Sequence, residues 1–234
     1  MPRTRPRASR IAAVAHDECV SLPALLAAEV RRDGARPFLT WYDDATGERI
    51  ELSVVTLANW AVKTANLLAD EHSLEPGDGV RLSPADHWLS FVAALGAWQL
   101  GACVDSDAAL DVPGDPAAFT ASVLPQPDAP TTGPVPPATP ALRSGGRTWT
   151  AAELADAAQQ AAAQHGVGRG ARILSTYALD TVTGLDASLA VPLAAGGSVV
   201  MVTNADPDRL ADRARMERAT HTAGCDAGGL PRLG

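Results

Sequence analysis

The sequence has few cysteines, few aromatic residues and a single lysine. Its cysteines, Cys19, Cys103 and Cys225, are odd in number, widely spaced and without a CxxC pair, so they indicate neither a disulfide framework nor a zinc site. Lys63 is the only lysine, and the other basic residues are arginines. It falls within a predicted helix, among positions that we interpret as packing positions, so the sequence suggests no catalytic lysine.

Long hydrophobic runs are absent as well. The longest apolar stretches, Trp88–Val104 and Leu185–Val202, are near the lower limit for a membrane-spanning helix, and glycines or a proline interrupt both. Near the N-terminus, Ile11–Ala15 is too short for the apolar region of a signal peptide. The sequence therefore predicts a cytoplasmic protein with no membrane partner.

Positive charge is scarce, and the net charge of −8 disfavours nucleic acid as a partner because such binding depends on neutralising phosphates. One exception is Met1–Arg10, which carries four arginines. We interpret residues 1–20 as a basic, flexible and solvated N-terminal arm rather than as a contact with nucleic acid or membrane.

With 46% hydrophobic residues and a mean hydropathy near zero, the remainder should be globular. Residues 21–107 alternate helical and strand-like patterns. Ser21 and Ser53 are candidate N-caps, and Asp43–Gly47 separates two strand-like runs as a hairpin turn would. Strands are predicted at Phe38–Tyr42, Glu48–Leu52, Val80–Leu82 and Ala102–Val104, with a further helix over about Trp88–Leu100.

Proline interrupts this pattern in residues 108–142. No periodic structure is compatible with the proline density of 125–140, because each proline removes a backbone donor and restricts the residue before it. We expect one short element at Ala117–Leu124 and otherwise a mobile linker that is sensitive to proteolysis.

The α/β pattern returns in residues 143–234, which form a second predicted lobe with a flexible C-terminal end. Thr150 and Glu153 fit a capping box. A helix is expected over about Gly184–Ala195, with strands at Ile173–Ser175 and Val199–Val202. Duplication of one lobe and independent use of common α/β patterns both remain open as the origin of this repeat. Alternating helices and short strands predict mainly parallel sheets in each lobe.

Several segments, read in order, resemble the adenylate-forming (AMP-binding) enzymes. They are Arg36–Thr40 (RPFLT), Asp44–Ser53 (DATGERIELS), Leu74–Val80 (LEPGDGV), Phe91–Ala102 (FVAALGAWQLGA), Val167–Leu174 (VGRGARIL) and Leu193–Val200 (LAAGGSVV). Gly79 stands where the family usually has an arginine. The chain is also similar to short actinobacterial proteins that are themselves weakly similar to AMP-binding enzymes. The resemblance implies an α/β fold of two small βα-type lobes, like the N-terminal half of the family's large domain.

The family's phosphate loop, [ST]-S-G-[ST]-T-G-x-P-K-G, has no clear counterpart. Thr131–Pro134 (TTGP) lies in the proline-rich segment and no lysine follows it. Gly145 and Gly146 precede Arg147 where the end of the loop is expected, but they indicate only a turn. In the family this loop holds triphosphate with backbone donors and hydroxyls. The later family motifs, including a magnesium ligand and a mobile lysine-bearing domain, have no counterpart either.

Other polar and aromatic groups have simpler structural interpretations. They are His16–Cys19 as possible metal ligands, Asp105, Asp107 and Asp111 as a possible magnesium site, Asp180 and Asp186 flanking Gly184, the isolated His87 and His221, and Trp60, Trp88 and Trp98. We interpret the acidic groups as solvated, one of Asp180 and Asp186 as a helix N-cap, and the tryptophans as core residues. No catalytic residue or metal ligand is assigned, and the cofactor-binding residues are unknown.

The favoured functional hypothesis is a degenerate, non-catalytic member of the adenylate-forming fold that acts as a binding or interaction module without a cofactor. Its partner would be a small molecule or a protein. The alternative is an AMP-dependent acyl- or amino-acid-adenylating ligase with an altered active site or residues supplied by a partner, which would need ATP and magnesium. A gene fragment without retained function is the third possibility.

Overall fold

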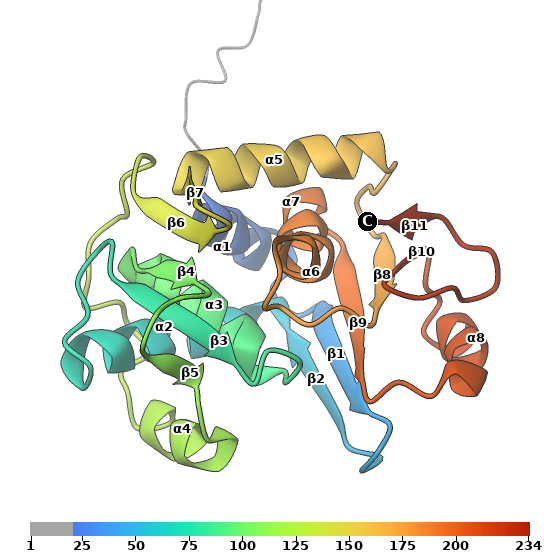
Figure 1. The fold of residues 1–234 in the computed structure, drawn as a ribbon, viewed down its shortest axis with the longest axis horizontal. Coiled ribbons are helices and arrows are strands. Elements are labelled where there is room, and N and C mark those ends of the chain that lie inside the picture. Colours follow the sequence, from blue (N-terminus) through green and yellow to red (C-terminus); the bar gives the residue numbers. More distant parts are fainter. Residues whose placement is uncertain (1–20) are drawn as a thin grey trace, which may run out of the picture.

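The computed structural model describes residues 21–234 and contains two β-sheets (Figure 1). The helices α2 (Val54–Asp70) and α3 (Leu89–Leu100) pack against each other, and each contacts a different sheet. The predicted N-terminal arm, Cys19 and the possible ligand group His16–Cys19 lie outside the described residues. Within the described part of the chain, none of the helices combines the length and apolar character needed to cross a membrane.

The first sheet has six strands in the order β11-β10-β8-β9-β1-β2. They are β1 (Pro37–Asp43), β2 (Arg49–Ser53), β8 (Arg172–Ser175), β9 (Ser198–Thr203), β10 (His221–Ala223) and β11 (Arg232–Leu233). All neighbours pair in parallel except the β1–β2 hairpin. Every residue of β9 is buried, as expected for a central strand covered on both faces.

The second sheet has five strands in the order β5-β3-β4-β6-β7. They are β3 (Gly79–Ser83), β4 (Cys103–Asp105), β5 (Asp111–Pro113), β6 (Pro140–Ser144) and β7 (Arg147–Thr150). Only the β6–β7 pair is antiparallel. The predicted strands in both halves are therefore confirmed, and so is their mainly parallel pairing.

Each sheet takes strands from both predicted lobes. The β1–β2 hairpin pairs with β9, which lies far along the chain, and β6 pairs with β4. The strands of the two sheets therefore do not correspond to the two predicted lobes on either side of residues 108–142. The physical reason is that the apolar strands β1 and β9 both need buried neighbours, and pairing with each other satisfies both.

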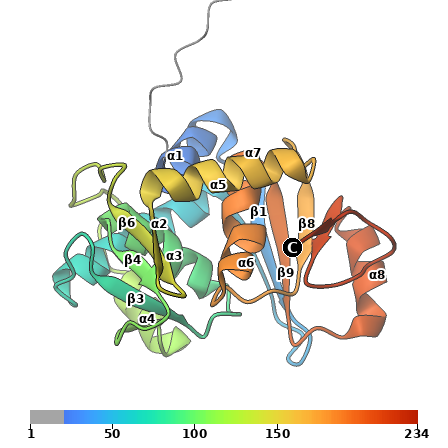
Figure 2. The same ribbon diagram turned by 45° about the horizontal axis from the view of Figure 1, so that its top comes forward.

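The helices fill the space between and above the sheets. They are α1 (Leu22–Asp33), α2 (Val54–Asp70), α3 (Leu89–Leu100), α4 (Pro116–Val123), α5 (Ala151–Gln164), α6 (Val182–Leu185), the π-helical η1 (Asp186–Ala190), α7 (Val191–Ala195) and α8 (Pro207–Met216). Helix α2 contacts β1 and β2, whereas α3 contacts β3, β4 and β5. Nearly all of α3 is buried, as expected for a helix that is apolar on every side. Figure 2 shows α5 extending across the top from β6 toward β8.

Local sequence signals explain how these helices begin. Ser21 accepts a hydrogen bond from the Ala24 amide and Ser53 accepts one from Thr56. Thr150 and Glu153 form the reciprocal capping box. These three predicted N-caps are confirmed.

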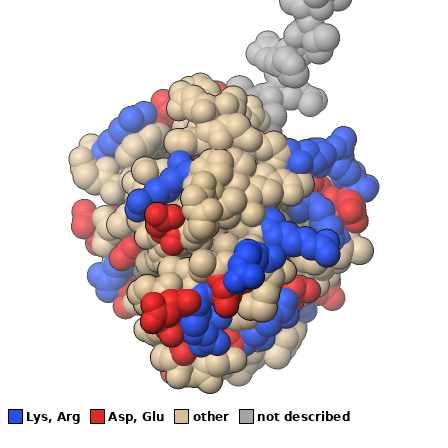
Figure 3. All heavy atoms as spheres, turned by 90° about the vertical axis from the view of Figure 1, so that its right-hand side faces the viewer, with Lys and Arg blue, Asp and Glu red and all other residues tan. Residues whose placement is uncertain are grey.

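Helix α8 is fixed to the β1–β2 hairpin by an ion pair. Asp44 Oδ1 lies 2.8 Å from Arg213 Nη2, and both side chains are at most 5% exposed. Beyond the helix, Glu217 accepts hydrogen bonds from Tyr42 and from Arg172 Nη2, the latter at 2.5 Å. On the face to the right of Figure 1, basic and acidic side chains lie beside one another, so this face does not have a single charge sign (Figure 3).

The proline-rich segment is largely coil, as predicted, but α2 binds it closely. Residues 125–139 contain no helix or strand. The Asn66 amide nitrogen donates to the carbonyls of Pro127 and Ala129, both at 3.0 Å. Lys63 donates to the Leu124 carbonyl at 3.1 Å and lies 3.1 Å from Asp128. Lys63 thus lies mid-helix beside buried positions, as expected, and its ammonium group contacts this segment.

Candidate functional site

The candidate site is a cleft of about 390 Å³ at the carboxyl ends of β3, β4 and β6. Parallel sheets bind ligands at this edge, where loops rather than strands provide the surface. The segment Leu179–Val182, which leads into α6, forms the opposite wall. The polar lining comes from Arg81, Ser83, Asp105, Ser106, Arg143, Ser144, Asp180 and Thr181.

Both arginines of the cleft are bound to carboxylates. Arg81 Nε lies 2.6 Å from Asp111 Oδ1, and this hydrogen bond raises the pKa of Arg81 and lowers that of Asp111. Arg143 contacts Asp105 Oδ2 at 3.3 Å and donates to the Gly77 carbonyl at 2.8 Å. An incoming anion would therefore have to compete with Asp105 and Asp111.

The possible magnesium site at Asp105, Asp107 and Asp111, which we did not favour from the sequence, is not assembled. Asp105 and Asp111 pair with arginines from neighbouring strands, and Asp105 also accepts from the Asp107 amide at 2.9 Å. Among residues 21–234, no three potential metal-binding side chains come together. The acidic residues neutralise arginines across the sheet.

The wall formed by Leu179–Val182 is held in place by backbone contacts. The Leu179 amide donates to the Ala85 carbonyl at 2.9 Å. Thr181 caps α6 by accepting from the Gly184 amide at 3.0 Å. Because a threonine is the cap, the prediction that Asp180 or Asp186 fills this role is wrong.

A two-residue turn joins β6 to β7 where the end of a phosphate loop is expected. Ser144 pairs with Arg147 across the hairpin, and only Gly145 and Gly146 lie between them. Both glycines have positive φ, 58° and 77°, which is the conformation of a tight type I′ turn. Such a turn has no run of inward-pointing amides that could surround a phosphate.

The TTGP segment, Thr131–Pro134, is bound to helix α2 rather than to the cleft. Thr131 donates to Asn66 Oδ1 through its backbone amide at 3.1 Å and its hydroxyl at 2.8 Å. The donors that would resemble those of a phosphate loop are therefore used to fix the proline-rich segment to α2.

The histidines singled out in the sequence, His87 and His221, lie in different surroundings. His87, in the loop before α3, has its ring 5.0 Å from that of Trp41 and accepts from the Leu89 amide at 3.2 Å. Burial lowers the pKa of His87. His221 is buried on β10, and its Nδ1 lies 2.8 Å from the Thr220 hydroxyl. These contacts give both rings structural roles.

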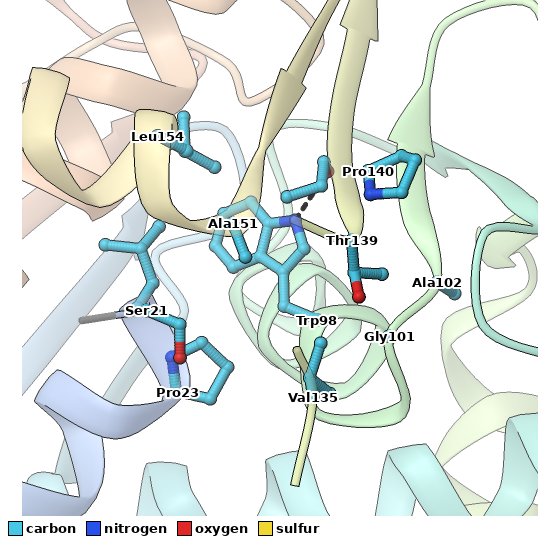
Figure 4. Close-up of a pocket in the computed structure, with 12 residues that line it drawn as sticks. Ser21, Pro23, Trp98, Gly101, Ala102, Val135, Thr139, Pro140, Ala151 and Leu154 are labelled. Atoms are coloured by element: carbon cyan, nitrogen blue, oxygen red, sulfur yellow. Dashed lines mark hydrogen bonds between the residues drawn. The ribbon is translucent and has the colours of Figure 1, made fainter. Parts of the chain in front are cut away.

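Trp98 lines a small pocket beneath α5 (Figure 4). Its indole Nε1 donates to the Ala141 carbonyl at 2.7 Å, and the pocket's volume is only about 10 Å³. This is too little space for more than a water molecule. Trp98 is confirmed as a core residue. Trp60 and Trp88 are half-buried at the edge of the core, and their ring centroids are 5.3 Å apart.

Comparison of the sequence with those of known proteins identifies its family. No family model matches the chain. A "TIGR03089 family protein" of Mycobacterium tuberculosis is 36% identical over 236 residues, covering 84% of this chain and 95% of the relative. The chain belongs to the TIGR03089 family.

Solved structures show the fold of this TIGR03089 family protein. The N-terminal domain of FACL13 from Mycobacterium tuberculosis matches with a TM-score of 0.73 at 14% identity, over 87% of this chain and 62% of that one. The anthranilate CoA ligase AuaEII gives 0.73 at 14% identity, over 88% and 48%. The nonribosomal peptide synthetase FmoA3 gives 0.72 at 20%, over 87% and 25%. The predicted resemblance to the N-terminal half of the adenylate-forming fold is confirmed, and the chain spans less than two thirds of each of these structures.

Sequence reasoning missed the hairpin beside the site and the contacts of Asn66 with the proline-rich segment. The consecutive glycines Gly145 and Gly146 were a signal for the β6–β7 hairpin, but only a turn was inferred from them. The contacts of Asn66 had no sequence signal, because a single asparagine within an apolar helix pattern does not identify its partner.

Proposed function

We propose that this TIGR03089 family protein is a non-catalytic member of the adenylate-forming fold and binds a small molecule in the cleft at the carboxyl ends of β3, β4 and β6. The observation that carries the proposal is the two-residue Gly145–Gly146 turn in place of a phosphate loop. Without amides arranged around it, a triphosphate has no backbone cradle at this point.

The charges of the cleft support the same proposal. A triphosphate needs several cationic or donor groups that are free to bind it. Arg81 and Arg143 already pair with carboxylates, and Lys63 contacts the proline-rich segment. Displacing Asp105 or Asp111 from its arginine would leave a carboxylate beside the anion, which opposes binding.

The cleft remains suited to a ligand of another kind. Its volume of about 390 Å³ falls within the roughly 300–1,000 Å³ typical of small-molecule sites. Leu82, Val104 and Leu142 give it apolar surface beside the serine hydroxyls and the ion pairs. A neutral or zwitterionic molecule with both polar and apolar parts fits this lining better than a nucleotide does.

The test is thermal unfolding and pyrophosphate exchange with magnesium-ATP. A ligand at about 100 times its dissociation constant stabilises the native state by roughly 2.7 kcal/mol. For a chain of this size that corresponds to about 5–10 °C in melting temperature. We expect a shift of at most about 1 °C with millimolar magnesium-ATP, and no exchange with a panel of carboxylic acids.

Exchange with any carboxylic acid would overturn the proposal in favour of an AMP-dependent ligase with an altered site. A clear shift without exchange would replace it with a nucleotide-binding module. Arg143→Ala locates any such shift in the cleft, and Arg32→Ala, on the exposed face of α1, is the matched control for loss of one arginine.

A further inference from the structure

A second cavity, of about 220 Å³, lies beside α6. It is open to solvent on one side and lined by the end of α5, the start of α6, the η1 segment, the start of α7, the end of β11 and Gly234. Its polar side chains are His165, Thr183 and Asp186. This cavity and the carboxyl-end cleft share only Val182 among their lining residues, and their polar side chains differ, so the proposal for this cavity does not rest on the proposed function.

Asp186 is the unusual residue of this cavity. No hydrogen bond or ion pair holds its half-buried side chain within the described residues, and Thr181 rather than Asp186 caps the helix. Burial raises the pKa of Asp186, and His165 at the end of α5 opposes this rise. The fold therefore keeps a half-buried carboxylate, without a protein partner among the described residues, at the wall of a cavity, where a bound cation would stabilise its charged form.

The π-helical turn determines where this carboxylate lies. The Val191 amide donates to the Asp186 carbonyl across five residues. Pro192 follows directly and has no amide to continue an α-helical pattern, which accounts for the wider turn. The wider turn brings Asp186 and Val191 to the same side of the helix, and both line the cavity. Turns of this kind occur frequently at functional sites.

The remaining walls identify the kind of cation. Ala161, Val182 and Val191 are apolar, so they would contact a hydrocarbon group. A metal ion needs more ligands than one carboxylate and one imidazole, and residues 21–234 bring no third such side chain to them. The volume is below the usual range for ligand pockets, so the occupant must be small.

We propose that this cavity binds a small organic ammonium compound, with the Asp186 carboxylate as its counter-charge and the apolar wall around its hydrocarbon part. His165 would accept a second hydrogen bond from the ammonium group when its imidazole is neutral.

The test measures binding of isobutylammonium to the full 234-residue chain by titration calorimetry or saturation-transfer NMR at pH 7.5. We expect saturable binding to the wild type and at least tenfold weaker binding to Asp186→Asn. Isobutanol, which has the same shape without the charge, should not bind measurably. Asp156→Asn, on the exposed face of α5, removes the same charge outside the cavity and should bind like the wild type.

Equal affinity of the wild type and Asp186→Asn, or equal binding of isobutanol, would overturn the proposal. So would the absence of saturable binding to the wild type. A measurement on the wild type alone guards against misfolding of the variant: amide chemical-shift changes caused by isobutylammonium should concentrate at Thr183–Ala187 and near Leu233. Changes concentrated elsewhere would show that the site is wrong.

Discussion

Asn66 connects the proline-rich segment to the core through four hydrogen bonds, and its replacement by alanine removes all of them. The side chain is fully buried. Its nitrogen donates to Pro127 and Ala129, and its oxygen accepts from the amide and hydroxyl of Thr131. The variant Asn66→Ala should therefore loosen this segment without disturbing either sheet.

The expected cost follows from these contacts. Each hydrogen bond contributes about 0.5–1.5 kcal/mol net, which gives about 2–6 kcal/mol for four. The released groups of residues 127–131 lie on a largely exposed segment and can bind water, which favours the lower end. Alanine also recovers roughly 0.5 kcal/mol of helix propensity. We expect a net loss of about 2 kcal/mol, or about 4–8 °C in melting temperature.

Thermal unfolding and limited proteolysis measure the two parts of this prediction. The variant should melt at lower temperature, and cleavage within residues 124–131 should accelerate while the sheets stay resistant. Asn59→Ala, at an exposed position of the same helix, should behave like the wild type because Asn59 makes no comparable contact. A melting temperature within about 1 °C of wild type, with unchanged cleavage, would refute the assigned role of Asn66.

Two further variants test other parts of the fold. A Cβ on Gly184 would lie 1.8 Å from the Ala178 carbonyl oxygen, so Gly184→Ala should lose about 1–3 kcal/mol in urea unfolding, whereas Gly168→Ala, with open space around it, should change little. Burial raises the pKa of Glu217, but hydrogen bonds from Tyr42 and Arg172 outweigh this effect and hold the pKa below its usual value of 4.5. This stabilisation is complete above pH 4.5 and is lost as pH falls through the lowered pKa. Wild type should therefore lose more stability than Glu217→Gln between pH 6 and pH 3, and parallel pH profiles would contradict this.

The elements that the sequence predicted are those determined by neighbouring residues. Ser53 caps α2 and the Thr150–Glu153 pair caps α5 because each cap needs only the residues of the first turn. Strand pairing depends on partners far along the chain, and no local pattern indicated that β1 would lie beside β9. The α/β class was therefore predictable, whereas the distribution of strands between the sheets was not.

The candidate site was less predictable for the same reason. The missing phosphate-loop motif was visible in the sequence, but the closure of that position by a two-residue hairpin required the pairing of Ser144 with Arg147. The ion pairs of Arg81 and Arg143 join residues of different strands. Asp186 was interpreted as a possible cap because acidic residues often begin helices, and only the structure shows that Thr181 occupies that position.

The groups that could have received a phosphate are used within the fold, so the proposed lack of nucleotide binding would rest on several elements at once. Thr131 contributes its amide and hydroxyl to Asn66, and Arg143 contributes its charge to Asp105. Gly145 and Gly146 close a hairpin that leaves no loop. Because these contacts lie in different elements, no single change would free a complete set of phosphate ligands. The carboxylate of Asp186, which has no partner among the described residues, is the opposite case, since the proposed ammonium compound would be its counter-charge.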